Sequence, residues 1–387
     1  MNKLNGLIQE LCPDGVEYKK VKEAFQRLRG TPITAGKMKE IEDPTGEIKI
    51  FAGGKTIINA KEENIPNANI TRVPAVLVQS RGVIDVVYYD KPFTFKNEMW
   101  AYTADNEIKV KYLYYVLKNN IQGFRDAASG MGSLPQISLP VTEDFRIPLP
   151  PLPVQREIVR ILDNFTELTA ELTAELAARR KQYEHYRDEL LTFGDEVPRI
   201  PLGEVGPVCM CKRILKSQTN DVGGVPFYKI GTFGKQANAY ISKETYEEYR
   251  NKYNFPKKGD ILISAAGTIG RTVVYDGGPA YFQDSNIVWV ANDETKILNR
   301  FLIHCYAMKP WYVSTGGTIA RLYNDNILKA VVPVPSLERQ KFIVDTLDRF
   351  DTLCNDLTSG LPAEIAARQK QYEYYRDKLL TFGEKEN

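Results

Sequence analysis

The chain has 387 residues, 43% of them hydrophobic, and its 51 basic and 49 acidic residues give a formal net charge of +2. This length allows two ordinary domains, and the lack of any run of about 18 apolar residues excludes a membrane span. The N-terminal sequence has no secretory signal and the five cysteines are scattered, so we expect a cytoplasmic protein without disulfide bonds. The near-neutral charge argues against nucleic-acid binding without excluding it, because basic residues can gather on a single face.

Residues 1–150 have the pattern of a globule built from short strands and helices. Runs of β-branched and aromatic residues separated by glycine and proline predict strands, as in AVLVQS (75–80). The segment EIKVKYLYYVLKN (107–119) predicts a short helix. We therefore expect an α+β globule in this part of the chain.

Residues 151–195 predict one long amphipathic helix. Pro153 suits its first turn, where no N–H is needed. Apolar residues recur every three or four positions from Ile158 to Leu172, then at a spacing of seven from Leu176 through Leu190, and Gly194 ends the pattern. About 40 residues at 1.5 Å each extend over roughly 60 Å, which is long for a globular helix.

Residues 196–335 predict a second α+β globule. The runs DILIS (260–264), RTVVY (271–275) and NIVWV (286–290) predict strands, and KILNRFLIHCYAM (296–308) predicts a short helix. His304 lies among the apolar residues of this helix, so we interpret it as a packed histidine. In both globules we expect a mainly antiparallel, curved sheet.

Residues 336–387 predict a second long helix. Ser336 is a suitable N-cap. Apolar residues continue from Ile343 to Leu357, a break is expected at 360–362, and the pattern resumes at Ile365. The chain therefore alternates globule, helix, globule, helix.

The two predicted helices contain nearly identical sequence segments. KQYEHYRDELLTFG (181–194) and KQYEYYRDKLLTFG (370–383) agree at 12 of 14 positions with an offset of 370 − 181 = 189. Upstream, RIPLPPLPVQREIVRILDNF (146–165) is echoed at 331–350 with an offset of 331 − 146 = 185. The difference of four places an insertion near 358–362 in the second copy, so the repeat is a duplication of half the chain.

The globules repeat more faintly. VEYKKVKEA (16–24) parallels VPRIPLGEV (197–205), and 75–90 parallels 260–276. FTFKNEMW (93–100) parallels FQDSNIVW (282–289). Since residues 7–24 resemble the end of the first helix running into the next globule, the sequence begins as if cut from a circle. We expect related but different tasks for the two globules.

The long helices need a partner for their apolar stripes. Two helices of matched pattern within one chain supply each other, so we predict an antiparallel intramolecular coiled coil with pseudo-twofold symmetry. The alternative is that each helix packs on its own globule. The predicted seam consists of Tyr183, Tyr186, Leu190 and Phe193 in the first helix and Tyr372, Tyr375, Leu379 and Phe382 in the second.

Catalytic and metal-binding motifs are incomplete in this sequence. GGKT (53–56) resembles the end of a phosphate-binding loop, but the required first glycine is Lys49. Cys209 and Cys211 are too close for a zinc site, and the chain has only two histidines. No nucleophile–base set recurs in both halves, so we predict that any function shared by the halves is not catalysis.

Two similar modules on a rigid helical spacer suit a target with two parts and a gap, such as duplex DNA. Arginine and lysine match guanine edges and phosphates, whereas asparagine and glutamine match adenine. The candidate DNA contacts are Arg27, Arg29, Gln79, Ser80, Arg81, Lys96, Arg125, Ser133, Lys212, Arg213, Lys229, Lys235, Gln236, Ser264, Thr268, Arg271 and Arg321.

Over essentially its full length the chain resembles the specificity subunit of a type I restriction–modification system. The proline-rich entry into an Ile-Val helix that closes with Tyr-Arg-Asp-x-Leu-Leu-x-Phe, present twice, carries the resemblance. It implies target-recognition domains at 1–150 and 196–335 and conserved helices at 151–195 and 336–387. Each domain is then expected to read half of an asymmetric bipartite site on double-stranded DNA.

The resemblance also implies partners. The helices would dock two modification subunits, which methylate adenine with S-adenosylmethionine, and restriction subunits would join them. The chain itself would have no enzyme activity, cofactor, metal or membrane association. A coiled-coil adaptor that binds two proteins without reading DNA remains the alternative. The recognition part of a combined restriction–modification enzyme is a third reading, which differs only in how the subunits are assembled.

Overall fold

The computed structural model describes residues 2–54, 56–129, 134–313 and 321–385. The chain divides into two units. Unit 1 consists of Met1–Thr173 with Glu364–Asn387, and unit 2 consists of Ala174–Ala363. Each unit therefore combines one globule with parts of both long helices.

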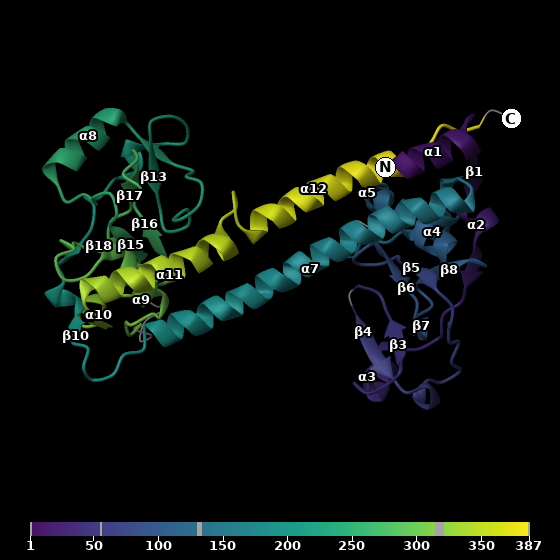
Figure 1. The fold of residues 1–387 in the computed structure, drawn as a ribbon, viewed down its shortest axis with the longest axis horizontal. Coiled ribbons are helices and arrows are strands. Elements are labelled where there is room, and N and C mark those ends of the chain that lie inside the picture. Colours follow the sequence, from purple (N-terminus) through teal and green to yellow (C-terminus); the bar gives the residue numbers. More distant parts are fainter. Residues whose placement is uncertain (1, 55, 130–133, 314–320, 386–387) are drawn as a thin grey trace. The chain divides into compact units, whose positions relative to one another are not determined.

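Unit 1 contains three sheets and their connecting helices (Figure 1). Its elements are α1 (Asn2–Leu11), β1 (Glu17–Lys20), α2 (Val21–Ala24), β2 (Gln26–Leu28), α3 (Ala35–Ile41), β3 (Ile48–Phe51), β4 (Ile57–Ala60), η1 (Glu62–Asn64), β5 (Ala75–Gln79), β6 (Asp85–Tyr89), β7 (Phe93–Phe95), β8 (Trp100–Thr103), α4 (Glu107–Asn119), α5 (Ile121–Asp126), α6 (Leu139–Glu143), β9 (Arg146–Leu149) and the first part of α7 (Leu152–Leu190).

The main sheet of unit 1 has the antiparallel order β2-β8-β5-β6. All five residues of β5 are buried, because β5 lies between two other strands and reads as a continuous apolar run. A second sheet, β4-β3-β7, contains a parallel pair, β3 with β7. The antiparallel pair of β1 and β9 leads into α7.

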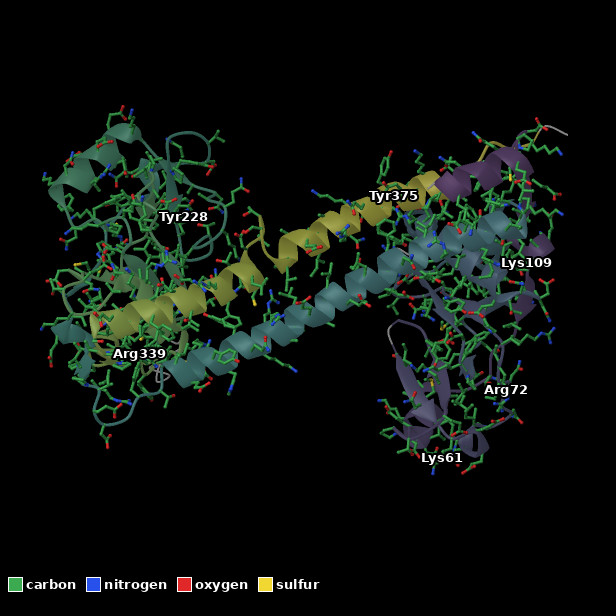
Figure 2. The ribbon with its side chains drawn as sticks, in the orientation of Figure 1. Lys61, Arg72, Lys109, Tyr228, Arg339 and Tyr375 are labelled. Atoms are coloured by element: carbon green, nitrogen blue, oxygen red, sulfur yellow. The ribbon has the colours of Figure 1, made fainter. Side chains whose placement is uncertain are left out.

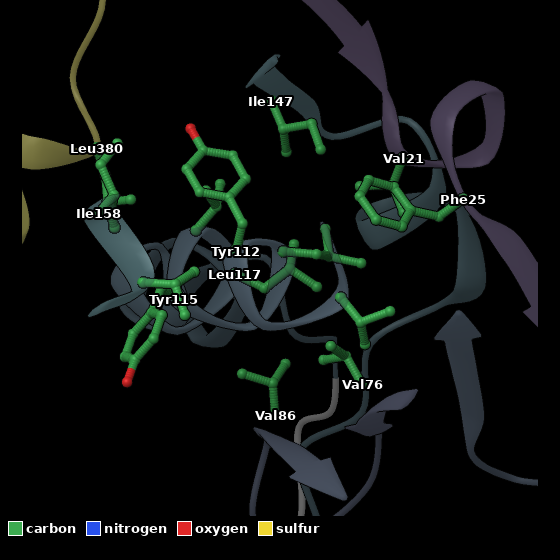
Figure 3. Packing of buried hydrophobic residues seen from close by; sticks show 14 of the residues in the cluster. Val21, Phe25, Val76, Val86, Tyr112, Tyr115, Leu117, Ile147, Ile158 and Leu380 are labelled. Carbon is green, nitrogen blue, oxygen red and sulfur yellow. The ribbon is translucent and has the colours of Figure 1, made fainter. Parts of the chain in front are cut away.

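One core cluster joins the globule of unit 1 to its helices. Tyr112 and Leu117 of α4 lie between the sheet and the long helices, and Ile158 of α7 and Leu380 complete this side of the core (Figure 3). The C-terminal part of α12 (Leu361–Leu379) runs antiparallel to the start of α7 in this unit (Figure 1). There the ring of Tyr375 (Figure 2) stacks on Phe165 at 5.6 Å.

Unit 2 is built from a matching series of elements. They are the end of α7, β10 (Arg199–Pro201), η2 (Leu202–Glu204), β11 (Val208–Cys209), η3 (Lys216–Gln218), β12 (Thr219–Asn220), β13 (Val225–Tyr228), β14 (Tyr240–Ile241), α8 (Lys243–Lys252), β15 (Ile261–Ser264), β16 (Thr272–Val274), β17 (Tyr281–Phe282), β18 (Ile287–Val290), α9 (Asn299–Ala307), α10 (Asn324–Leu328), β19 (Val331–Pro333) and α11 (Leu337–Asn355).

The sheets of unit 2 repeat those of unit 1. The main sheet has the order β11-β18-β15-β16, which matches β2-β8-β5-β6 strand for strand. The second sheet, β12-β14-β13-β17, again contains one parallel pair, β13 with β17. The predicted α+β class with mainly antiparallel sheets is confirmed, and the shared order shows that the faint repeat in the sequence is a repeat of topology.

The end of α7 packs against α11 in unit 2. Ile343 and Leu347 of α11 are fully buried, and Tyr183 and Leu190 of α7 pack against their cluster. The rings of Tyr186 and Phe350 lie 5.5 Å apart. The two helices run antiparallel (Figure 1), so both units contain the predicted antiparallel helix pair.

The alternative interpretation is also partly correct, because the same helices pack on the globules. Tyr372, Tyr375 and Phe382 contact the core of unit 1, in which Leu379 is buried. Phe193 contacts the core of unit 2. In each unit, the residues of the helix seam therefore also contact the globule.

The predicted element boundaries need two corrections. The helix α7 ends at Leu190, four residues before Gly194, because residues 194–197 form a turn closed by the Val197 N–H and the Gly194 carbonyl. The break between α11 and α12 covers 356–360, so Pro362 belongs to the first turn of α12, where proline is tolerated. The Ser336 side chain accepts a hydrogen bond from the Arg339 N–H, which confirms it as the cap.

Candidate nucleic-acid interface

Three of the predicted contact residues are buried. The exposed fractions of Gln79, Ser80 and Ser264 are 6%, 0% and 1%. The Ser80 hydroxyl donates to the Glu98 carbonyl, and the Ser264 hydroxyl accepts from the Arg271 N–H at 2.8 Å. The two serines hold strand ends in place and Gln79 is buried beside Ser80, so none of the three belongs to an exposed interface. The sequence alone could not show this, because a polar residue at a strand end is often exposed.

Two further candidates, Arg271 and Arg125, donate hydrogen bonds to main-chain carbonyls, and a third, Lys96, forms an ion pair. One guanidinium nitrogen of Arg271 donates to the Phe233 carbonyl at 2.8 Å. Arg125 donates through Nε to the Ile84 carbonyl at 3.1 Å. Lys96 forms an ion pair with Glu98 at 3.0 Å. None of these three side chains lines either of the two grooves described below.

Unit 1 contains a polar groove of about 750 Å³, called groove 1 below. It lies between β2 and the loop that follows it, the turn before β8, and the segment that leads into α6. Its polar lining consists of Arg27, Arg29, Asn67, Asn69, Asn97, Glu98, Gln136 and Ser138. Arginine and amide side chains therefore dominate its polar lining, and apolar residues such as Met99 and Trp100 complete the groove.

Unit 2 contains a second polar groove of about 430 Å³, called groove 2 below. It is formed by the loops that follow β11 and β13, the turn before β18, and the segment that leads into α10. Its polar lining consists of Arg213, Lys216, Thr219, Lys229, Gln283, Asp284, Ser285, Asn286 and Arg321. Four cationic side chains face one carboxylate in this lining, so the groove has a positive potential.

The two grooves occupy equivalent places in the two units. The Ile137 N–H donates to the Ser80 carbonyl at 2.9 Å, and the Leu322 N–H donates to the Ala265 carbonyl at 2.9 Å. Donors and acceptors both differ by 185 (322 − 137 and 265 − 80), the offset found in the helices. The short helices α6 and α10 begin at the same offset (324 − 139).

The structure brings five of the predicted residues into the grooves. Arg27 and Arg29 line groove 1, and Arg213, Lys229 and Arg321 line groove 2. Arg27 also pairs with Glu143 at 3.2 Å, in a contact that is largely exposed to solvent. These residues combine phosphate-binding cations with neighbours that can pair with base edges.

The remaining candidates lie elsewhere. Arg81 borders a different hollow in unit 1 together with Lys96. The Lys212 ammonium lies over the Tyr253 ring at 5.1 Å, and Lys235 borders an aromatic hollow with Tyr228. Gln236 and Thr268 are exposed. Ser133 lies outside the described residues.

The sequence-based prediction missed several groove residues, notably Asn69, Gln136 and Gln283. Extending the helix repeat backwards at its offset of 185 aligns Gln136 with Arg321, so this signal was available in the sequence. For Asn69 and Gln283 the sequence holds no comparable signal, because each reaches its groove from a loop that only the fold brings close.

Metal ligands, cysteines, membrane-spanning helices and the buried His304 are the other features that could indicate a function. Among residues 2–54, 56–129, 134–313 and 321–385, no group of three or more metal-ligating side chains comes together, and the five cysteines are unpaired. No helix within these ranges has both the length and the apolar content needed to cross a membrane. His304 is buried, as predicted, and its Nε2 lies 3.2 Å from the Asp348 carboxylate.

A duplicated α+β fold with an equivalent groove in each unit, lined by cations and amides, is the arrangement expected of a two-domain protein that selects nucleic-acid sequences. The model of a family described as the type I restriction modification DNA specificity domain matches residues 13–179 and again 195–367. The chain belongs to this family.

Individual relatives agree with this membership. The chain is 51% identical over 300 residues to a Haemophilus influenzae chain described as a type I restriction enzyme specificity subunit, covering 75% of this chain and 77% of the relative. It is 31% identical over 373 residues to the specificity subunit of the Escherichia coli type I restriction enzyme EcoR124I/EcoR124II, covering 90% of both chains. The crystal structure of a type I S subunit from M. genitalium has the same fold, with a TM-score of 0.61 at 17% identity over 95% of this chain and 96% of the other.

Proposed function

We propose that this protein reads a two-part DNA sequence, with groove 1 contacting one half and groove 2 contacting the other. The observation that carries this proposal is the equivalent position of the two grooves, which are lined by different side chains. Equivalent placement gives both units the same approach to a duplex. Different linings give each unit its own sequence preference, so the whole target is asymmetric.

The charge of the grooves sets how each is expected to bind. Arg213, Lys216 and Lys229 border groove 2 and suit phosphate contacts, which position the protein without reading sequence. Groove 1 carries fewer cations and more amides, which suit base edges. We therefore expect binding that weakens as salt rises, with a larger share of the salt dependence arising from unit 2.

The repeated helices are proposed to dock two modification subunits. The two copies of the repeated phrase expose the same polar positions, although Tyr186 and Leu190 are more exposed than Tyr375 and Leu379. Tyr183 and Tyr372 are half-buried, whereas the polar neighbours Gln182, Glu184 and Asp188 of the first copy are exposed, as are Gln371, Glu373 and Asp377 of the second. Two equivalent polar faces suit two copies of one partner.

We also propose that chemistry belongs to the partners. S-adenosylmethionine would bind the modification subunits, and restriction subunits would attach to the complex they form with this chain. This chain would supply sequence selection.

Binding of the complete chain, assembled with its modification subunits, to duplexes of mixed sequence tests the proposal. Selection of one bipartite sequence, with two fixed parts and an unspecified gap, is the expected result. A complex that assembles but retains all duplexes equally would contradict DNA reading, and would support an adaptor that only joins two protein partners.

A further inference from the structure

Residues 136 and 321 occupy the same place at the edges of the two grooves. The offset of 321 − 136 = 185 is the one that relates the helices. Each residue directly precedes a buried anchor, Ile137 in unit 1 and Leu322 in unit 2, whose exposed fractions are 2% and 1%. Because the anchors make equivalent main-chain hydrogen bonds, the backbone delivers both side chains to equivalent points.

The backbone around Gln136 is held on both sides. Its N–H donates to the Ser129 carbonyl at 3.1 Å, and its carbonyl accepts from the Ser129 N–H at 2.9 Å. Its side chain is exposed and lines groove 1. A fixed backbone with an exposed amide is a suitable arrangement for reading a ligand, since little main-chain entropy is lost on binding.

Arg321 is positioned more firmly. One of its terminal nitrogens donates to the Ser285 carbonyl at 2.8 Å in the turn before β18. Ser285 has a left-handed backbone, with φ of 59°. A guanidinium has five N–H donors in a planar fork, so this bond orients the group over groove 2 and leaves donors for a base.

The two side chains have complementary preferences. The amide of glutamine pairs with the N6 and N7 atoms of adenine, and the fork of arginine pairs with O6 and N7 of guanine. We propose that Gln136 and Arg321 are equivalent specificity-determining residues, Gln136 selecting adenine in one half of the target and Arg321 selecting guanine in the other. This inference rests on the proposed function and adds which position reads a base in each half.

A contact of Arg321 with phosphate is the competing explanation. A phosphate contact weakens binding to all sequences by a similar factor, whereas a base contact changes the preference at one position. The two explanations therefore differ in an observable other than affinity.

The test uses the complete chain assembled with its modification subunits and carrying Arg321→Gln, Arg321→Lys or Gln136→Arg. Each complex is offered duplexes randomised in both halves, and the adenines that it methylates are located by sequencing. Arg321→Gln is expected to relax one guanine in one half, with a loss of about 5- to 150-fold in discrimination, and to leave the other half unchanged. Gln136→Arg is expected to change the preference for one adenine in the opposite half of the target.

Arg321→Lys retains the charge but loses the planar fork. It is expected to lose discrimination at the same base while keeping more affinity than Arg321→Gln. If Arg321→Gln does not fold, this variant still tests whether Arg321 reads a base. Lys252→Gln on α8 and Gln122→Arg on α5 make the same kinds of change outside the groove linings. These two controls are expected to keep the original target.

An unchanged target with Arg321→Gln, or a uniform loss of affinity for every sequence, would overturn this inference and leave the proposed function intact. A wild-type complex without any sequence preference would instead overturn the proposed function itself. The two failures are therefore distinguished by the wild-type measurement.

Discussion

The Tyr18 hydroxyl donates a hydrogen bond of 2.9 Å to the main-chain carbonyl of Phe382, across 364 positions of the chain. In unit 2 the Arg199 guanidinium donates to the carbonyl of Phe193 at 2.8 Å. Phe382 and Phe193 hold the same place in the repeated phrase (382 − 193 = 189). The two donors also correspond, because Tyr18 lies opposite Pro148 and Arg199 opposite Pro333.

The junction between the end of the repeated phrase and the first strand of the following globule is thus formed in two ways. In unit 2 it lies within one continuous stretch, whereas in unit 1 it joins segments that are far apart in the sequence. The Val16 N–H donates to the Gly383 carbonyl at 2.9 Å, and the Lys385 N–H donates to the Val16 carbonyl at 3.0 Å. These contacts join the two segments of unit 1 as the continuous chain joins the corresponding segments of unit 2.

Replacing Tyr18 by phenylalanine tests this closure. The variant loses the hydrogen bond to Phe382 and keeps the ring, so unit 1 is expected to lose about 0.5–1.5 kcal/mol of stability. Amide hydrogen exchange in β1 and α12 measures the loss locally. Tyr374→Phe, at an exposed position on α12, is the matched control, and equal exchange in both variants would show that the bond adds nothing.

Gln155 and Gln340 offer a matched pair of core variants. Both donate to a proline carbonyl five residues earlier, Gln155 to Pro150 at 2.7 Å and Gln340 to Pro335 at 2.9 Å. Gln340 also donates to the Lys296 carbonyl and accepts from the Leu298 N–H, both in the segment that leads into α9. Within the described part of the chain, the buried Oε1 of Gln155 has no hydrogen-bond partner.

Gln340→Leu is therefore expected to destabilise unit 2 by about 2–4 kcal/mol, because it leaves buried main-chain groups unpaired. Gln155→Leu is expected to cost unit 1 about 1 kcal/mol, because the Pro150 carbonyl loses its donor while an unpaired oxygen is removed. Urea unfolding followed by hydrogen exchange in each unit measures the difference. Equal losses would contradict the role given to the α9 contacts.

The break between α11 and α12 requires a glycine. A Cβ on residue 360 would lie 2.5 Å from the Thr352 carbonyl oxygen and 2.8 Å from that of Asp356. Gly360→Ala is expected to destabilise this region by about 1–3 kcal/mol, since main-chain atoms must move. Gly6→Ala in α1 meets no atom within 4 Å, so it is expected to raise stability by up to about 1 kcal/mol through helix propensity. Thermal unfolding of both variants checks the opposite signs.

The buried His304 predicts a pH dependence for unit 2. Burial lowers the pKa of His304 below its usual value, although Asp348 and Asp351 act in the opposite direction and Arg300 reinforces the decrease. The Tyr183 hydroxyl lies 3.5 Å from the other ring nitrogen of His304, Nδ1. Since the unfolded chain takes up the proton more readily, the stability of unit 2 is expected to fall as pH decreases through about 6.5 and below.

His304→Tyr removes this titration with a residue that the fold already uses. Tyr115 holds the equivalent place in unit 1 (304 − 115 = 189) and donates to Asp163 at 2.6 Å. The variant is expected to flatten the stability of unit 2 between pH 7 and 5, whereas His185→Tyr, at an exposed position, should not. Hydrogen exchange of α9 across this pH range is the measurement, and an unchanged slope would assign the dependence to other groups.

The helix α7 continues from unit 1 into unit 2, so its length is expected to set the gap in the DNA target. Four residues added between 169 and 174 lengthen a helix by about 6 Å, which corresponds to roughly two base pairs. Sequencing of methylated adenines should reveal a wider gap with both half-sites retained. An unchanged gap would show that α7 does not act as the spacer.

Much of the fold could be predicted from the sequence because its signals are local or repeated. The runs at 75–80, 260–264 and 286–290 became β5, β15 and β18, and 107–119 became α4. Burial on both faces of a central strand demands continuous apolar residues, and a long amphipathic helix demands regular spacing, so both leave strong patterns. The near-identity of the two phrases likewise showed two equivalent helical surfaces.

The grooves depended on tertiary structure. Gln79, Ser80 and Ser264 have suitable chemistry for reading DNA, yet they are buried at strand ends. Gln136 and Arg321 reach groove edges only because a buried neighbour fixes the backbone beside them. By itself the sequence determined the class of fold, the duplication and the family. The fold decided which polar side chains reach the surface together, because burial depends on contacts between segments that are far apart in the sequence.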